Sequence, residues 1–282
     1  MPELPDVEGF RAVLAGQATG HRVERVDVAD AGVLRGITAR QLNDGLCGRR
    51  FAKPGRRGKW LIARTDGPTV LMHFGMTGSL HWLEGGAPRH RYDRVVFVTD
   101  AGELRYRDMR KLQGLTLARD PREEDRVLAG LGPDALEVTP KELDQLLERR
   151  RGAIKAILIN QKFLAGLGNL LADEILWRAR IHPRRPAGSL TARERRRLHS
   201  QIRRVLRESV QAARVPPRPS WLTGVRDLRN PQCPRCRTPL CRGRAGGRTT
   251  VWCPRCQGSG TRPFGITDEL AHPGSSAQVA TP

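Results

Sequence analysis

The chain has 282 residues, of which 38% are hydrophobic, so it is long enough for two domains with buried cores. No apolar run approaches the ~20 residues that cross a bilayer, and the acidic opening is unlike a signal peptide, which predicts a cytoplasmic protein without a membrane partner. Lysine and arginine number 50 against 29 acidic residues, and the formal charge of +21 predicts a polyanionic partner, for which nucleic acid is the usual choice.

The first 120 residues are predicted to be rich in β-structure. Apolar residues at 5–14 recur with helical spacing, which indicates an opening amphipathic helix. Alternating or β-branched runs follow, separated by clusters of glycine, aspartate and proline, at 22–28, 59–64, 69–74, 94–99 and 103–106. This pattern is typical of a β-sandwich or a flattened barrel.

From Thr139 onward the hydrophobic period is that of helices. Thr139 is the expected N-cap of the first one, with Pro140 at its first position and Glu142 completing a capping box. Helices are predicted at 140–149, 152–161, 169–179 and 191–213. Between positions 178 and 207 there are eleven arginines and a single acid, Glu194, an asymmetry that favours a binding face. Arginine-rich codon usage explains part of the total, because only six of the 50 basic residues are lysine.

Four cysteines near the C-terminus have the spacing of a structural zinc site. They follow C-x2-C-x16-C-x2-C, so two hairpins can place four thiolates around one Zn²⁺: Cys233, Cys236, Cys253 and Cys256. A pair of redox sites is the alternative, but the sequence lacks the βαβ context that such sites need. Because four cysteines leave no open coordination position, the metal is expected to hold the fold. The run 248–252 is predicted as a strand of this finger that carries Arg248 toward a phosphate.

A glycine-punctuated turn at 161–170 separates two predicted helices. Asn169 at the N-cap of the second helix, beside free backbone N–H groups, would make an anion site that suits a phosphate. The alternative is a glycine C-cap between two core helices. Lys155 one turn upstream and the arginine-rich stretch favour the DNA interpretation.

These features occur in one order together with three more. The chain opens Met-Pro-Glu-Leu-Pro-Asp-Val-Glu, and the turn Arg-Arg-Gly-Lys at 56–59 precedes the run His-Phe-Gly-Met-Thr-Gly at 73–78. With the turn at 165–169 and the finger, this order resembles the formamidopyrimidine-DNA glycosylase / endonuclease VIII family, the helix-two-turns-helix glycosylases. The resemblance runs from Met1 to about residue 262.

The resemblance implies an α+β multidomain fold with an N-terminal β-sandwich and flanking helices, a helical helix-two-turns-helix domain and a zinc-finger β-hairpin. The expected divisions are a catalytic domain at 1–120, a linker at 121–138, the DNA-binding domain at 139–224, the finger at 225–262 and a disordered tail at 263–282. A monomer that acts on damaged double-stranded DNA in the bacterial cytoplasm, at the nucleoid, is expected.

The resemblance also assigns roles to residues. Removal of Met1 exposes the secondary amine of Pro2, the expected nucleophile, and Glu3 is the expected general acid. An α-amine has a pKa of about 7.7–8.0, so a useful fraction of it is neutral at cellular pH. Lys59 is expected to bind phosphate beside the lesion, while Lys155, Asn169 and Arg248 grip the flanking phosphates.

Rotating a nucleotide out of the duplex leaves a space that side chains must fill. Met76, Arg110 and Leu112 match the family positions that do so, although the formamidopyrimidine branch typically has Phe where Leu112 stands. Asp6 replaces the usual Glu of that branch. The segment 209–233 is short, rich in proline and unlike the family's lesion-capping loop.

Three functions therefore remain open. The first is a glycosylase/lyase for oxidised purines, favoured by the Met76 segment. The second is an enzyme like endonuclease VIII for oxidised pyrimidines or abasic sites, favoured by the short segment. The third is a DNA-damage binder without catalysis, against which Pro2 and Glu3 count.

Overall fold

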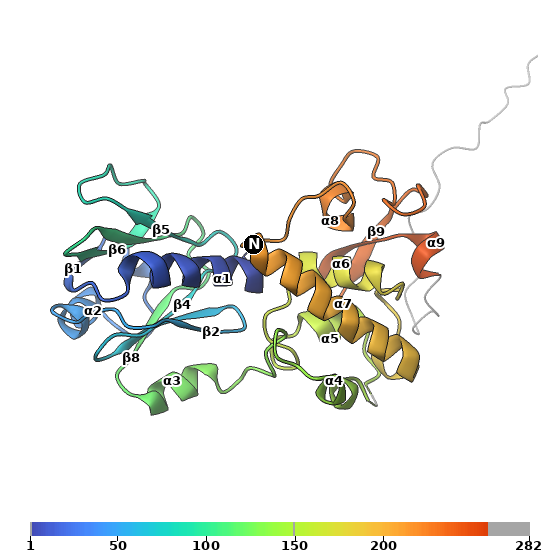
Figure 1. Cartoon of the computed structure of the whole chain (residues 1–282), viewed down its shortest axis with the longest axis horizontal. Helices are drawn as coiled ribbons and strands as arrows, with labels where there is room; N and C mark the ends of the chain where they lie inside the picture. The colour runs from blue at the N-terminus through green and yellow to red at the C-terminus, as the bar shows by residue number, and fades with distance from the viewer. Residues whose placement is uncertain (1, 149, 259–282) are drawn as a thin grey trace, which may run out of the picture.

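The computed structural model describes residues 2–148 and 150–258 and has two lobes that lie side by side (Figure 1). The N-terminal lobe is a β-sandwich with flanking helices, and the C-terminal lobe combines helices with a β-hairpin. This arrangement confirms the predicted fold class. Within the described residues, no helix is both long and apolar enough to span a membrane. The tail predicted at 263–282 lies outside the described residues.

Two four-stranded antiparallel sheets, ordered β1-β6-β7-β5 and β2-β3-β4-β8, form the sandwich. Their bounds are β1 (Val23–Val28), β2 (Gly55–Arg57), β3 (Trp60–Ala63), β4 (Thr69–His73), β5 (Ser79–Leu83), β6 (Asp93–Thr99), β7 (Glu103–Arg107) and β8 (Leu115–Ala118). Aliphatic and aromatic side chains fill the space between the sheets, and Phe51 meets Phe97 edge-on with ring centroids 6.0 Å apart. The sequence did not indicate β2, β5 or β8, because these short strands depend on pairing with their neighbours.

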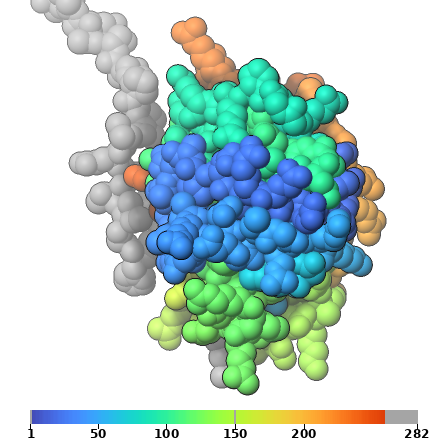
Figure 2. Space-filling model, turned by 90° about the vertical axis from the view of Figure 1, so that its left-hand side faces the viewer, coloured from blue at the N-terminus to red at the C-terminus, as the bar shows by residue number. Residues whose placement is uncertain are grey.

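Helix α1 (Leu4–Val13) joins the two lobes, because it packs against strands of both sheets and against α7 (Ala192–Gln211). In the end-on view of Figure 2, α1 runs in dark blue across the middle of the N-terminal lobe. A wide helical turn at Leu14–Ala18 continues it. Two further helices flank the sandwich, α2 (Ala39–Leu46) and α3 (Pro121–Leu128), and α3 lies within the segment predicted as a linker.

The helices of the C-terminal lobe follow the predicted positions, with ends shifted by a few residues. They are α4 (Pro140–Leu147), α5 (Ile154–Ile159), α6 (Asn169–Arg178), α7 and the short α8 (Leu222–Val225). Thr139 caps α4 in a reciprocal capping box with Glu142. Helix α6 differs from the prediction, since Gly168 is its N-cap and Asn169 its first helical residue. Short 3-10 turns lie at Ala31–Val33 and Ala187–Ser189.

The hairpin lies between the two cysteine pairs and packs on α6. Strands β9 (Cys241–Ala245) and β10 (Arg248–Trp252) pair in an antiparallel register, and the short α9 (Pro254–Gln257) follows. The strand lies where 248–252 was predicted. Gly246 and Gly247 between the strands have φ of 58° and 72°, which matches a two-residue hairpin turn that needs positive φ at both positions.

Candidate active site

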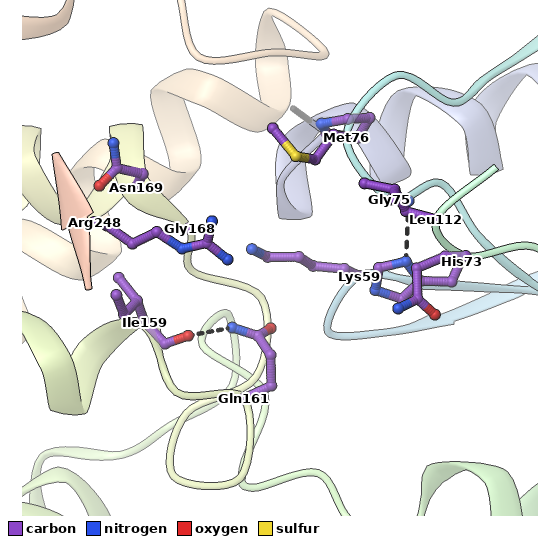
Figure 3. Close-up of a pocket in the computed structure, with 12 residues that line it drawn as sticks. Lys59, His73, Gly75, Met76, Leu112, Ile159, Gln161, Gly168, Asn169 and Arg248 are labelled. Atoms are coloured by element: carbon purple, nitrogen blue, oxygen red, sulfur yellow. Dashed lines mark hydrogen bonds between the residues drawn. The ribbon is translucent and has the colours of Figure 1, made fainter. Parts of the chain in front are cut away.

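A pocket of about 410 Å³ lies where the lobes meet. Residues from both lobes line it, as Figure 3 shows, and they are Pro2, Lys59, His73, Gly75, Met76, Leu112, Gln113, Ile159, Gln161, Gly168, Asn169 and Arg248. Six of the predicted site residues therefore line one cavity, although they come from segments more than 240 positions apart in the chain.

The carboxylate of Glu3 sits at the N-terminus of α6. The backbone N–H groups of Gly168 and Leu170 donate to Glu3 Oε2 and Oε1, both at 2.8 Å, and that of Leu171 donates to Oε2 at 3.2 Å. Gly168 permits this approach, because a Cβ there would lie 2.3 Å from Glu3 Cδ. The backbone N–H groups that were predicted to face a DNA phosphate at this helix end thus bind a protein carboxylate, whereas Asn169 itself lines the pocket.

Burial governs the acidity of Glu3, whose side chain is almost fully removed from solvent. Desolvation raises the pKa of Glu3 above its ordinary value, although Lys59 and the three N–H donors lower it. Asp6 lies outside the pocket lining; its Oδ2 accepts the backbone N–H of Glu3 at 2.8 Å and closes the capping box of α1. A buried carboxyl of raised pKa therefore lies next to Pro2, and Pro2 lines the pocket.

Two cations face each other across the pocket. Lys59 follows β2 in the N-terminal lobe, Arg248 begins β10 in the other lobe, and Figure 3 shows their charged ends pointing toward one another. Burial lowers the pKa of Lys59, Arg248 lowers it further, and Glu3 raises it. Like charges that approach in this way attract an anion between them. The arrangement fits the phosphate contacts predicted for both residues.

A buried ion pair fixes the turn that carries Lys59. Arg56 Nε lies 2.6 Å from Glu8 Oε1, and Arg56 Nη1 lies 2.6 Å from Asp134 Oδ2. The same Oδ2 accepts the backbone N–H of Gly58 at 2.7 Å. Because Asp134 belongs to the connection between the lobes, these bonds couple the position of the Lys59 turn to the relative placement of the lobes.

Lys155 lies in the interior of the protein and not on the pocket lining. It is completely buried, and its Nζ lies 2.6 Å from Asp173 Oδ1. It also donates to Thr249 O at 3.0 Å and to Thr250 Oγ1 at 2.8 Å. Its ammonium group is thus bound by groups of the protein itself and is unavailable to a phosphate in this structure. Its contacts instead hold the start of β10, the strand that carries Arg248.

The three residues predicted to fill the space of an extruded nucleotide lie together. Met76 and Leu112 line the pocket, with 36% and 48% of their surface exposed, and Arg110 Nη1 lies 3.2 Å from Met76 Sδ. Asp108 anchors this loop, because its Oδ1 accepts from Thr77 Oγ1 at 2.5 Å and from the backbone N–H of Arg110 at 3.1 Å. Exposed apolar side chains held at a pocket rim are suited to entering a base stack.

His73 and Gln161 also shape the pocket, although no role was predicted for either from the sequence. His73 Nδ1 accepts the N–H of Gly75 at 3.1 Å, and burial together with Lys59 lowers its pKa to about 4. Gln161 Nε2 donates to the carbonyls of Ile159 and Leu167, at 2.9 and 2.8 Å. His73 stands in the run 73–78 and Gln161 begins the turn at 161–170, so each was within a noted motif. Only the fold shows that they face the same cavity.

The four predicted metal ligands cluster in the hairpin. Their sulfur atoms lie within 4.8 Å of one another, with Cys233–Cys256 at 3.8 Å and Cys236–Cys253 at 3.5 Å. A tetrahedral Zn–S bond of about 2.3 Å places sulfurs about 3.8 Å apart, so the donor set fits. The indole N–H of Trp177 donates to Cys233 Sγ at 3.3 Å, as an outer partner of a metal ligand does. The cluster can hold a metal ion.

Comparison with known proteins agrees with this geometry. Two family models match the chain, the formamidopyrimidine-DNA glycosylase N-terminal domain over residues 1–115 and the formamidopyrimidine-DNA glycosylase H2TH domain over residues 130–216. A formamidopyrimidine-DNA glycosylase of Symbiobacterium thermophilum is 41% identical over 275 residues, which cover 91% of this chain and 89% of that protein. One of Heliobacterium modesticaldum is 38% identical, with 91% and 100% covered. The chain belongs to the formamidopyrimidine-DNA glycosylase family.

Solved structures with the same fold contain DNA. A complex of Lactococcus lactis Fpg with DNA containing an abasic site has a TM-score of 0.83 and 27% identity, covering 92% of this chain and 100% of that one. Another complex of that protein contains an oxidised pyrimidine, with a TM-score of 0.83 and the same coverage. As a member of this family, the chain is a DNA glycosylase of base-excision repair.

The segment 209–232 packs into the C-terminal lobe. Trp221 is buried in the helical core, Leu222 contributes to the core beneath the hairpin, and Arg226 pairs with Asp173. No residue between 209 and 232 lines the pocket.

The arginine-rich stretch at 178–207 forms ion pairs within the protein, such as Arg185–Glu194 at 2.5 Å. None of its eleven arginines lines the pocket.

Proposed function

We propose that this protein is a bifunctional DNA glycosylase and abasic-site lyase that excises oxidised bases, with purines favoured. The observation that carries the proposal is the placement of Pro2 on the wall of the pocket, next to a buried Glu3 whose pKa is raised. Removal of Met1 would leave a secondary amine at that wall. The cavity between Lys59 and Arg248 then receives the damaged nucleotide and its phosphates.

The chemistry follows from an amine beside a carboxyl. The nitrogen of Pro2 attacks C1′ of the deoxyribose, the bond from C1′ to the base breaks, and the base leaves with a proton. Glu3 supplies a proton to the sugar ring oxygen or to the departing base, which a carboxyl of raised pKa does more readily. The Pro2 nitrogen then loses its proton, and the bond from C1′ to the ring oxygen breaks as that oxygen takes up a proton, which leaves an iminium between Pro2 and C1′. The iminium withdraws electrons, so loss of the C2′ proton expels the 3′ phosphate and nicks the strand. Continued elimination expels the 5′ phosphate.

The remaining pocket residues position the DNA in this proposal. Lys59, Asn169 and Arg248 contact phosphates at the extruded nucleotide. Met76, Arg110 and Leu112 occupy the space that the nucleotide leaves in the duplex. Lys155 affects DNA binding only by holding the hairpin strand that carries Arg248.

An enzyme for oxidised pyrimidines or abasic sites is the second candidate. One observation favours it: the segment 209–232 lines no part of the pocket, so a base would meet no cap from it. The proposed preference for purines rests on the Met76 segment. Excision rates on a panel of duplexes, each with one oxidised purine or pyrimidine, decide between the two.

We also propose that the four-cysteine cluster holds one structural Zn²⁺ per monomer. Cys233, Cys236, Cys253 and Cys256 would be its ligands, and the bound ion would fix the hairpin on which Arg248 sits. A closed four-thiolate site leaves no position for a substrate, so the metal takes no part in base excision.

Borohydride reduction of a complex with an abasic-site duplex tests the nucleophile, because reduction turns an iminium into a stable covalent bond. We expect the mature protein to form a trapped adduct. A short peptide extension kept in front of Pro2 should abolish trapping while binding persists, because the nitrogen is then an amide. The same extension at the C-terminus is the matched control and should leave trapping intact.

Glu3→Gln separates excision of the base from reaction of Pro2 with a preformed abasic site. We expect it to slow excision of a damaged base by roughly 100-fold or more, since general acid catalysis typically contributes 10²–10⁴-fold, while trapping on a preformed abasic site persists. A mature protein that binds the abasic duplex without forming an adduct would identify a non-catalytic damage binder. An adduct with the blocked N-terminus would assign the nucleophile to another amine.

A further inference from the structure

A second hollow of about 410 Å³ lies on the C-terminal lobe, formed by the end of α6, by α7, by the segment before α8 and by the loop of the first cysteine pair. It shares no lining residue with the pocket at Pro2. Its lining consists of Trp177, Arg178, Gln201, Arg204, Glu208, Arg218, Ser220, Trp221 and Arg235. Four arginines and two tryptophans thus meet in one small space.

The two tryptophans are buried and hold guanidinium groups in place. The guanidinium carbon of Arg178 lies 4.4 Å from the ring centroid of Trp221, and that of Arg235 lies 4.5 Å from the ring of Trp177. Arg218 also lies over Trp221, at 5.8 Å. Stacking on an aromatic face limits the freedom of these side chains, so less entropy is lost when they bind an anion.

Glu208 is the carboxylate that three of the four arginines share. Its Oε1 lies 3.1 Å from Arg204 Nε and 3.9 Å from Arg178 Nη1, and its Oε2 lies 3.3 Å from Arg218 Nη1. Arg178 has a nearer partner in the buried Glu174, at 2.7 Å. Within the described residues, Arg235 is in no ion pair. Four positive charges therefore face two negative charges, which leaves an excess that a further anion would neutralise.

We propose that this arginine–tryptophan pocket is a second phosphate-binding site. Guanidinium forks match phosphate oxygens in bidentate hydrogen bonds, and Arg204 and Arg218 present theirs at the exposed mouth, with 65% and 52% of their side chains accessible. The tryptophan faces are covered by Arg178 and Arg235, so the site takes a phosphate group and not a stacked base. That phosphate belongs either to the DNA backbone beyond the lesion or to a free phosphate compound.

Inorganic pyrophosphate is the probe for the site itself. Calorimetric titration is done on the full protein already saturated with a duplex of about 12 base pairs carrying an abasic-site analogue, which fills the pocket at Pro2. We expect saturable binding, weakened at least tenfold in R204A/R218A because the excess charge is gone. The control, R193A/R196A, removes two exposed arginines of the same helix outside the hollow and should bind as the parent protein does.

Duplex length distinguishes the two sources of phosphate. If the site takes a backbone phosphate, R204A/R218A weakens a duplex of about 30 base pairs more than one of about 12, and lowers the slope of log affinity against log salt by about 1–2. If it takes a free compound, only pyrophosphate binding is lost. The proposal is overturned if the parent complex binds no pyrophosphate and R204A/R218A shows no such dependence on duplex length. It is also overturned if the control variant R193A/R196A loses as much affinity as R204A/R218A. Base excision on the short duplex should be unchanged in either variant, so a failure here leaves the proposed function standing.

Discussion

At the scale of single residues, the N-terminus of α6 shows how a helix end selects an anion. Backbone N–H groups and the helix dipole favour any negative charge there, and Glu3 supplies it from the other lobe. The carboxylate lies next to Pro2, which lines the pocket, and the helix end whose N–H groups were predicted to bind a phosphate orients the proposed general acid. Gly168 is required because Glu3 occupies the space of a side chain.

His73 gives a prediction at the same scale. Its pKa is lowered to about 4 in the folded protein, against about 6.5 in an unfolded chain. Between these values the unfolded chain binds a proton that the folded protein does not, so stability falls as pH falls from 7 toward 4. The loss from pH 7 to pH 5 should be about 2 kcal/mol.

Urea unfolding at both pH values measures this loss in the parent protein and in His73→Gln. The variant should lose less stability over the same interval, by about that amount. Equal losses of stability in the two proteins would show that the pKa of His73 is not lowered in the folded protein.

At the scale of elements, β10 is attached to the helices by buried charges. Asp173 of α6 accepts the backbone N–H of Val251 at 3.2 Å and pairs with both Lys155 and Arg226. Burial raises the pKa of Asp173 and lowers that of Lys155, while their mutual attraction opposes both shifts. Removing one partner of such a buried set is costly, so the set constrains where the hairpin can lie.

Lys155→Met tests whether Lys155 positions Arg248. We expect DNA affinity to fall about tenfold for damaged and undamaged duplexes alike, with the slope of log affinity against log salt unchanged, because no phosphate contact is lost. Arg248→Ala should lower that slope by about one. The exposed Lys141→Met is the control and should change neither quantity. If the salt slope falls in Lys155→Met as much as in Arg248→Ala, Lys155 contacts a DNA phosphate directly.

At the scale of the whole molecule, the candidate active site exists only where the lobes meet. Helix α1 packs on both lobes, and the Arg56–Asp134 pair locks the Lys59 turn to the connection between them. The cysteine cluster packs with Trp177 of α6 at the base of the hairpin, and Figure 1 places β9 and α9 farther from the sandwich than α6. The sandwich and the helical lobe each have their own core, so loss of the hairpin leaves the sandwich core intact.

Metal chelation, or Cys253→Ser, should therefore abolish DNA binding before the N-terminal lobe unfolds. Fluorescence anisotropy with a labelled abasic duplex reports binding, and hydrogen exchange of β6 and β7 reports the sandwich. Cys241→Ser is the matched control, because this cysteine lies in the hairpin outside the four-sulfur cluster. Simultaneous loss of binding and of protection in the sandwich would place the domain boundary elsewhere.

The sequence by itself determined the local features of this protein. Hydrophobic periods located most strands and helices, Thr139 and Glu142 marked a helix start, and the spacing of four cysteines predicted one cluster, because each of these signals acts over a few residues or within one hairpin. The order of the motifs along the chain was sufficient to predict the family.

Only the tertiary structure decided which groups face one another. It placed Glu3 at the end of α6, Lys59 opposite Arg248, and Lys155 in the interior against Asp173. Pairings between distant segments depend on how the lobes pack, and a lysine in the sequence looks the same whether its partner is a phosphate or a buried aspartate. Pro2 was predicted from the sequence, whereas the pocket around it required the assembled lobes.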